Sequence, residues 1–228
     1  MLKLKLFIPG FLFLYFITAS VYSSYSSAEE DDFLASSIFD DKQMLNGYSD
    51  KYALEDKELL LAIIQDETVT PFKTAAAVRV FKEKFCEEIF TKEKKAAERI
   101  LIRRLNRTDS PFVQVEIMHT LCLMDRYKYF DSMVPLLITK MDHYNDTVNE
   151  MAFAGINNII EEGNNRPREA RIIFNILRRQ FFLSRGRLAN LAEPDPRLIQ
   201  KFQILRWTLK VLGTQEIRRL PKEVINLL

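Results

Sequence analysis

The chain has 228 residues, of which 47% are hydrophobic and 28% are charged. This balance excludes a disordered chain, and the length suits one domain of ordinary size. Only 6 glycines occur, which fits an all-helical fold, because such folds need few of the positive-φ turns that glycine serves. The formal net charge of +2 comes wholly from two lysines near the start, Lys3 and Lys5.

Residues 1–28 have the pattern of a secretory signal peptide. Lys3 and Lys5 precede an apolar stretch at 6–18, and small residues up to Ala28 stand before an acidic run. The apolar stretch is shorter than the roughly 20 residues that a membrane span needs. We therefore expect an exported protein, periplasmic or secreted, that is cleaved after Ala28. The alternative is an uncleaved N-terminal anchor in the inner membrane.

The remaining chain is neutral in sum but divided in charge. Residues 29–163 hold 17 basic and 26 acidic residues, a net of −9, whereas residues 164–228 hold 14 basic and 5 acidic, a net of +9. Such asymmetry between halves can mark an interaction surface. It can also reflect ordinary solvated faces, or two ends of a curved array that attract each other.

The first part of this remaining chain, residues 29–54, is acidic and rich in turn residues. Its apolar residues Phe33, Ile38, Met44 and Leu45 predict one loose helix that caps the domain.

Four helix starts follow at similar spacing. They lie at Thr70-Pro71, Ser110-Pro111, Asn145-Asp146 and Asp195-Pro196, separated by 40, 35 and 50 residues. Thr, Ser, Asn and Asp are N-cap residues whose side chains can accept a free backbone N–H, and proline suits the first helical position. An amphipathic stretch precedes each start, so the pattern predicts stacked helical hairpins.

The predicted hairpins share an apolar stripe. The position seven residues after the cap is apolar in all four, as Ala77, Ile117, Ala152 and Phe202. The first helices of the pairs are expected within 59–64, 96–105, 134–138 and 170–183, and the last pair is enlarged by 184–193. Gly213 should end the second helix of the fourth pair. Residues 214–228 should add a half-repeat with a short helix after Pro221.

Two stretches, LLLAIIQDETVTPFKTAAAVRVF at 59–81 and EPDPRLIQKFQILRWTLKVLG at 193–213, resemble HEAT repeats, and the turn Glu193-Pro194-Asp195-Pro196 matches the D-P-D-P turn of that family. The resemblance implies an all-α fold over 55–228: an α-solenoid of about four HEAT-like hairpins in a right-handed superhelix. It also implies a binding scaffold. The chain departs from the family at the arginine four residues after the cap, where it has Thr74, Gln114, Asn149 and Ile199.

Catalytic and metal-binding motifs are absent from the sequence, so we expect neither an enzyme nor a metal or cofactor. His119 has Cys122 one turn away, but a zinc site needs four clustered ligands, so His119 is interpreted as a partly buried helical residue. His143 should be solvated in a turn. Cys86 and Cys122 are expected to remain thiols. Adjacent acidic pairs are interpreted as solvent-facing, because adjacent helical residues point about 100° apart.

A cluster of seven arginines is the candidate partner-binding site. It comprises Arg166, Arg168, Arg171, Arg178, Arg179, Arg185 and Arg187. Arginine makes bidentate contacts to carboxylate and phosphate groups. For an exported protein we expect a protein partner with an acidic surface, or peripheral contact with an anionic membrane surface, rather than nucleic acid. The alternative is that the arginines only solvate a helix whose core residues are Phe174, Ile176, Leu177, Phe181 and Phe182.

Two functions follow from these predictions. The first is a non-enzymatic protein-binding scaffold or adaptor of the cell envelope. The second is an accessory subunit or chaperone of an enzyme or of a lyase-like cofactor-attachment system. The second function requires a ligand pocket, expected in the enlarged fourth pair near Trp207, the single tryptophan.

Overall fold

The structure, a computed structural model, describes residues 40–86, 91–162, 166–191 and 194–228. These residues form helices and no strand, which confirms the predicted all-α class. The expected signal peptide, 1–28, lies outside the described residues, as do Phe33 and Ile38.

The helices begin close to the predicted starts. In chain order they are α3 (Asp41–Tyr52), α4 (Lys57–Gln65), α5 (Pro71–Phe85), α6 (Thr91–Arg107), α7 (Pro111–Met124), α8 (Arg126–Lys140), α9 (Asp146–Glu162), α10 (Pro167–Leu188), α11 (Pro196–Leu212), the 3₁₀-helix η1 (Thr214–Arg219) and α12 (Lys222–Ile225). The chain divides into two compact units, 1–44 and 45–228. In the first unit, the Asp40 carboxylate accepts the backbone N–H groups of Lys42 and Gln43, which begins α3.

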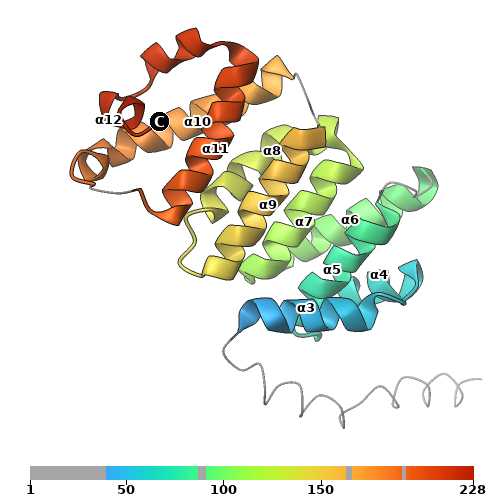
Figure 1. Ribbon diagram of the computed structural model, residues 1–228. Coiled ribbons are helices and arrows are strands. Elements are labelled where there is room, and N and C mark those ends of the chain that lie inside the picture. The colour runs from blue at the N-terminus through green and yellow to red at the C-terminus, as the bar shows by residue number, and fades with distance from the viewer. Residues whose placement is uncertain (1–39, 87–90, 163–165, 192–193) are drawn as a thin grey trace, which may run out of the picture. The chain divides into compact units, whose positions relative to one another are not determined.

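Within the second unit, the two helices of each predicted pair pack together (Figure 1). These pairs are α4 with α5, α6 with α7, α8 with α9, and α10 with α11. The second helix of each pair also contacts the second helix of the next, so that α5 lies against α7, α7 against α9, and α9 against α11. The helices are therefore packed against each other in the order of the chain.

Helix α7 is the centre of this packing. It contacts α5, α6, α8 and α9, and 11 of its 14 residues are buried. The aligned apolar positions Ala77, Ile117, Ala152 and Phe202 are all buried, as the repeat pattern predicts. A helix that is covered on several sides needs apolar residues around most of its circumference, which explains the nearly continuous apolar sequence of α7.

The predicted side-chain caps are only partly correct. Asn145 Oδ1 accepts the N–H of Val148 at 3.2 Å, and Asp195 Oδ1 accepts that of Leu198 at 2.7 Å. Thr70 and Ser110 make no side-chain capping bond. Helices α5 and α7 still begin after these two residues, because the proline that follows each has a φ already suited to the first helical turn.

All four first helices are longer than their apolar stretches predicted, and α8 and α10 show the largest extensions. Helix α8 begins at Arg126, where Asp125 Oδ1 accepts the N–H of Lys128 at 3.0 Å, and Pro135 lies inside it. Helix α10 continues past the expected end at Leu183 to Leu188. Apolar periodicity marks the buried part of a helix, so it misses solvated turns that extend the helix. Gly213 ends α11 with φ 103°, as predicted.

Two helical glycines have contrasting surroundings. A Cβ added to Gly155 in α9 would lie 3.3 Å from Cγ of His119 in α7, whereas a Cβ added to Gly186 in α10 would meet nothing within 4 Å. Gly155 therefore permits the close approach of α9 to the His119 ring, and Gly186 meets no such packing requirement.

These surroundings predict opposite effects of the same substitution. Gly186→Ala should raise the free energy of unfolding by about 0.5–1 kcal/mol, because alanine is the better helix former and the space is open. Gly155→Ala should lower it, because hydrogen bonds on both ring nitrogens hold His119 in place. Urea denaturation of both variants measures this, and equal gains in stability would contradict the assigned role of Gly155.

Candidate binding site

A buried polar network crosses helices α5, α7 and α9. The Glu116 carboxylate of α7 accepts from Arg79 Nε at 2.8 Å and from Lys82 Nζ at 2.7 Å, both in α5. Lys82 Nζ also lies 3.2 Å from His119 Nδ1, and His119 Nε2 lies 3.1 Å from Asn158 Oδ1 in α9. The network is satisfied by the chain's own groups and so needs no ligand.

The charges in this network shift the pKa values of two groups. Burial alone would raise the pKa of Glu116, but Lys82 and Arg79 outweigh burial and lower it to about 2. Burial and the Lys82 ammonium lower the pKa of His119 to about 4. Near neutral pH His119 is therefore uncharged: Nδ1 accepts from Lys82, and Nε2–H donates to Asn158.

Within the described residues, neither the cysteines nor a cluster of metal ligands forms a candidate functional site. Cys86 and Cys122 are buried thiols, and burial raises the pKa of Cys122 to about 12. Cys122 is among the core residues. Across the described ranges, no group of three or more His, Cys, Asp or Glu side chains is arranged to hold a metal ion.

The seven candidate arginines all lie on or beside α10, but they form two groups. Arg166 pairs with Glu169 at 3.2 Å, Arg168 with Asp131 at 2.6 Å, and Arg171 with Glu216 at 2.8 Å. The remaining four, Arg178, Arg179, Arg185 and Arg187, have no ion pair or side-chain hydrogen bond with the described residues. Arg168 and Arg171 tie α10 to α8 and η1, whereas the Arg166 pair lies within the start of α10. The other four arginines carry positive charge that no described residue pairs.

Two hydrophobic side chains lie among the four unpaired arginines and are exposed to solvent. Phe182 is 45% exposed and Leu183 80% exposed, so the expectation that Phe182 belongs to the core is wrong. Phe174, Leu177 and Phe181 are buried as expected. At 100° per residue, Phe182 lies between Arg178 and Arg179 around the helix, and Leu183 lies between Arg179 and Arg187. We call these six residues, Arg178, Arg179, Phe182, Leu183, Arg185 and Arg187, the α10 patch.

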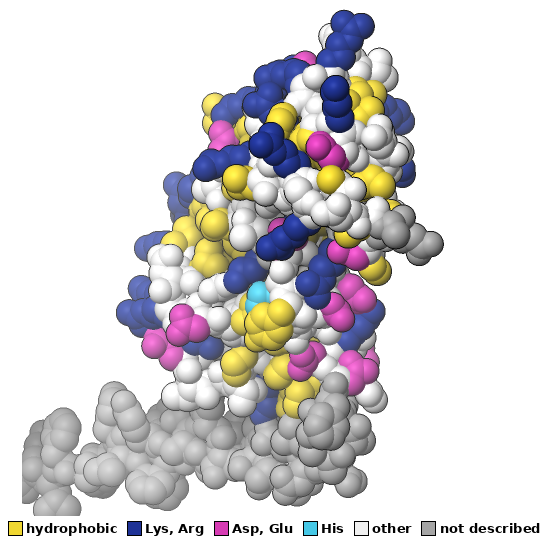
Figure 2. Space-filling model, turned by 90° about the vertical axis from the view of Figure 1, so that its left-hand side faces the viewer, with side chains coloured by type: hydrophobic (Ala, Val, Ile, Leu, Met, Phe, Trp, Pro, Cys, Tyr) yellow, Lys and Arg dark blue, Asp and Glu magenta, His cyan; other side chains and the backbone are white. Residues whose placement is uncertain are grey.

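Basic side chains gather around this part of the unit. Figure 2 shows Lys and Arg side chains concentrated over the region of α10 to α12, while Asp and Glu are more frequent over the earlier helices. The view agrees with the net charge of +9 over residues 164–228.

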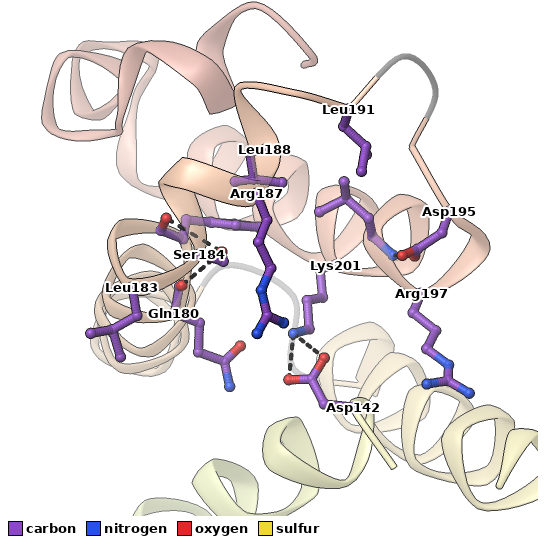
Figure 3. A pocket seen from close by; sticks show the side chains of 12 residues that line it. Asp142, Gln180, Leu183, Ser184, Arg187, Leu188, Leu191, Asp195, Arg197 and Lys201 are labelled. Atoms are coloured by element: carbon purple, nitrogen blue, oxygen red, sulfur yellow. Dashed lines mark hydrogen bonds and ion pairs between the residues drawn. The ribbon is translucent and has the colours of Figure 1, made fainter. Parts of the chain in front are cut away.

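A hollow of about 670 Å³ lies beside the patch (Figure 3). Its walls come from the C-terminal part of α10, the start of α11 and the turn between α8 and α9. Lys201 donates to both carboxylate oxygens of Asp142, each at 2.6 Å, across this space. Sequence reasoning anticipated a pocket in the fourth pair but missed Asp142 and Lys201. Trp207, expected near it, does not line it.

Comparisons with protein-family models, curated proteins and solved structures find no significant match to this chain. None of the helices described here is long and apolar enough to cross a membrane.

The His119 network predicts how stability depends on pH. An unfolded histidine titrates near 6.5, whereas folded His119 has a pKa of about 4. Between these values the unfolded chain binds more protons, so His119 should make the protein less stable as the pH falls from about 6.5 to 4. Glu116 adds a loss that begins below its ordinary pKa of 4.5 and continues toward 2.

The melting temperature between pH 7.5 and 4.5 measures this effect. As the pH is lowered, the melting temperature of His119→Gln should fall less steeply than that of the unmodified protein, because glutamine does not titrate. His143→Gln is the control for removing a histidine outside the network. Burial lowers the pKa of His143 as well, so this variant should also flatten the curve, but less than His119→Gln, because His143 is only half-buried. Superimposable curves for His119→Gln and the unmodified protein would refute the assignment.

Proposed function

We propose that residues 55–228 form a HEAT-like α-solenoid that serves as a non-enzymatic protein-binding scaffold of the cell envelope. Two features support the solenoid: each helical pair packs internally, and successive second helices contact one another from α5 to α11. Arrays of this kind present extended surfaces and bind partners through them. The signal-peptide pattern in residues 1–28 supports export.

The α10 patch is the observation that carries the binding role. Four arginines without partners among the described residues surround two exposed hydrophobic side chains on one helix. Arginine and aromatic residues dominate the energetics of protein interfaces, and exposed apolar area rimmed by charge marks interaction sites. The positive charge selects a partner with an acidic surface and makes its association sensitive to salt.

Charge reversal tests this role against a matched control. Arg178→Glu with Arg179→Glu should slow association with the native partner at least about tenfold at low salt. Arg99→Glu with Arg103→Glu makes the same charge change at two exposed arginines of α6 and should change it far less. The partner is first captured by cross-linking in the native envelope, and association rates are then measured for both variants across a salt series.

Equal slowing by the two variants would show a general charge effect and reject the α10 patch as the docking site. Binding of the unmodified protein to vesicles containing anionic lipid, with no protein captured, would replace the protein partner by a membrane surface.

Export is tested by N-terminal sequencing of the protein recovered from cells. Cleavage of the proposed signal peptide should leave Glu29 as the first residue, because the small residues before it suit signal peptidase. A chain that starts at Met1 in the membrane fraction would establish the anchored alternative.

An accessory subunit or chaperone of an enzyme or cofactor-attachment system is the second candidate function. The hollow in the fourth pair favours it, because its volume lies within the range of small-molecule sites. Thermal stabilisation by a candidate cofactor, abolished by filling the hollow with Ser184→Phe, would support it.

A further inference from the structure

The hollow beside α10 combines an apolar wall with charged groups from distant parts of the chain. Leu188, Leu191 and Leu198 supply apolar surface. The charged groups include Arg187 of α10, Lys201 of α11 and Asp142 from the turn after α8. Such a mixture suits a ligand with both an apolar and a polar part.

Of the three cations that line the hollow, two are paired with carboxylates. Lys201 is held by Asp142, and Arg197 is held by Asp146 at 2.7 Å. Asp195, the other acidic residue of the lining, accepts the N–H of Leu198 as the cap of α11. Arg187 has no partner among the described residues, and Figure 3 shows its guanidinium directed into the hollow toward the Lys201–Asp142 pair. Among the described residues that line the hollow, Arg187 is thus a cation without an ion-pair partner, and it stands beside a second cation, Lys201.

A hydrogen-bond acceptor in the same space is also unsatisfied. Within the described chain, Gln180 Oε1 is buried without a hydrogen-bond partner, and Gln180 lines the hollow. A buried acceptor without a donor destabilises a fold, so a turn of the Gln180 side chain that brings Oε1 to a ligand N–H adds a bond that the described residues do not supply. A peptide supplies both requirements at once: a carboxylate for Arg187 and a backbone N–H for Gln180.

We propose that the hollow is the anchor site for an acidic segment of the partner protein, in which a carboxylate side chain stands beside an apolar one. The carboxylate binds Arg187 next to Lys201, the apolar side chain packs on Leu188, Leu191 and Leu198, and a backbone N–H donates to Gln180. This inference rests on the proposed scaffold function and places the specificity of binding at the end of α10. The remaining arginines of the α10 patch attract the acidic segment electrostatically. The hollow determines which peptide sequence binds.

Selection of peptides from a random display library on the full-length protein tests the proposal. Enriched peptides should combine Asp or Glu with Leu, Ile or Phe, and amide analogues of their acidic residues should lose binding. Arg187→Gln should weaken the synthesised peptides about tenfold, the effect of losing one charge-assisted hydrogen-bond pair.

Arg185→Gln is the matched control, because it removes an equally exposed arginine of the same helix that does not line the hollow. It should weaken binding by about twofold or less. Melting temperatures of both variants should match the unmodified protein, since neither side chain has a partner in the described chain to lose.

Three results would overturn the proposal. They are selected peptides without acidic enrichment, equal weakening by Arg185→Gln and Arg187→Gln, and competition by free glutamate or phosphate as strong as by the peptide. Equal weakening would leave the scaffold function standing, with the partner bound over the whole α10 patch. The scaffold function itself fails only if reversal of Arg178 and Arg179 leaves binding of the native partner unchanged.

Discussion

The carboxylate of Glu116 sets the constraint on which the packing of the central helices depends. Glu116 is 4% exposed, and a charge so buried is tolerated only if it is paired and hydrogen-bonded. Arg79 and Lys82, one turn apart on α5, meet this requirement together. His119 continues the network to Asn158 of α9. A shift of α5 along α7 would leave a buried charge unpaired, so this network fixes the alignment that hydrophobic contacts alone would leave loose.

The same physics explains part of the charge asymmetry along the chain. Arg168, Arg197 and Lys201 belong to the basic segment 164–228, and their partners Asp131, Asp142 and Asp146 belong to the acidic one. These pairs join the third hairpin to the fourth, so some of the opposite charges attract each other locally. The arginines of the α10 patch are different, because they have no such partners. Their charge therefore acts on whatever approaches the surface.

The sequence predicted the helix starts well because their signals are local. A proline or a capping residue acts within one turn, and the starts of α5, α7, α9 and α11 follow directly from such residues. The sequence failed where tertiary packing decides. Ser110 Oγ is buried without a partner among the described residues instead of capping α7, and Phe182 is exposed. The seven arginines stay candidates, and contacts from Glu169, Asp131 and Glu216 separate three of them from the other four.

The lining of the hollow could not be predicted, because it depends on the length of α10 and on residues far apart in the chain. Apolar periodicity ends near Leu183, yet the helix continues to Leu188 and carries Arg185, Gly186 and Arg187 with it. If α10 ended at Leu183, the hollow would lose the wall formed by Arg187 and Leu188. The extension of α10 beyond Leu183 is therefore the main departure of the fourth pair from the other three. The same extension completes the wall of the hollow. Local departures from an otherwise consistent pattern are where functional requirements are expected to outweigh folding ones.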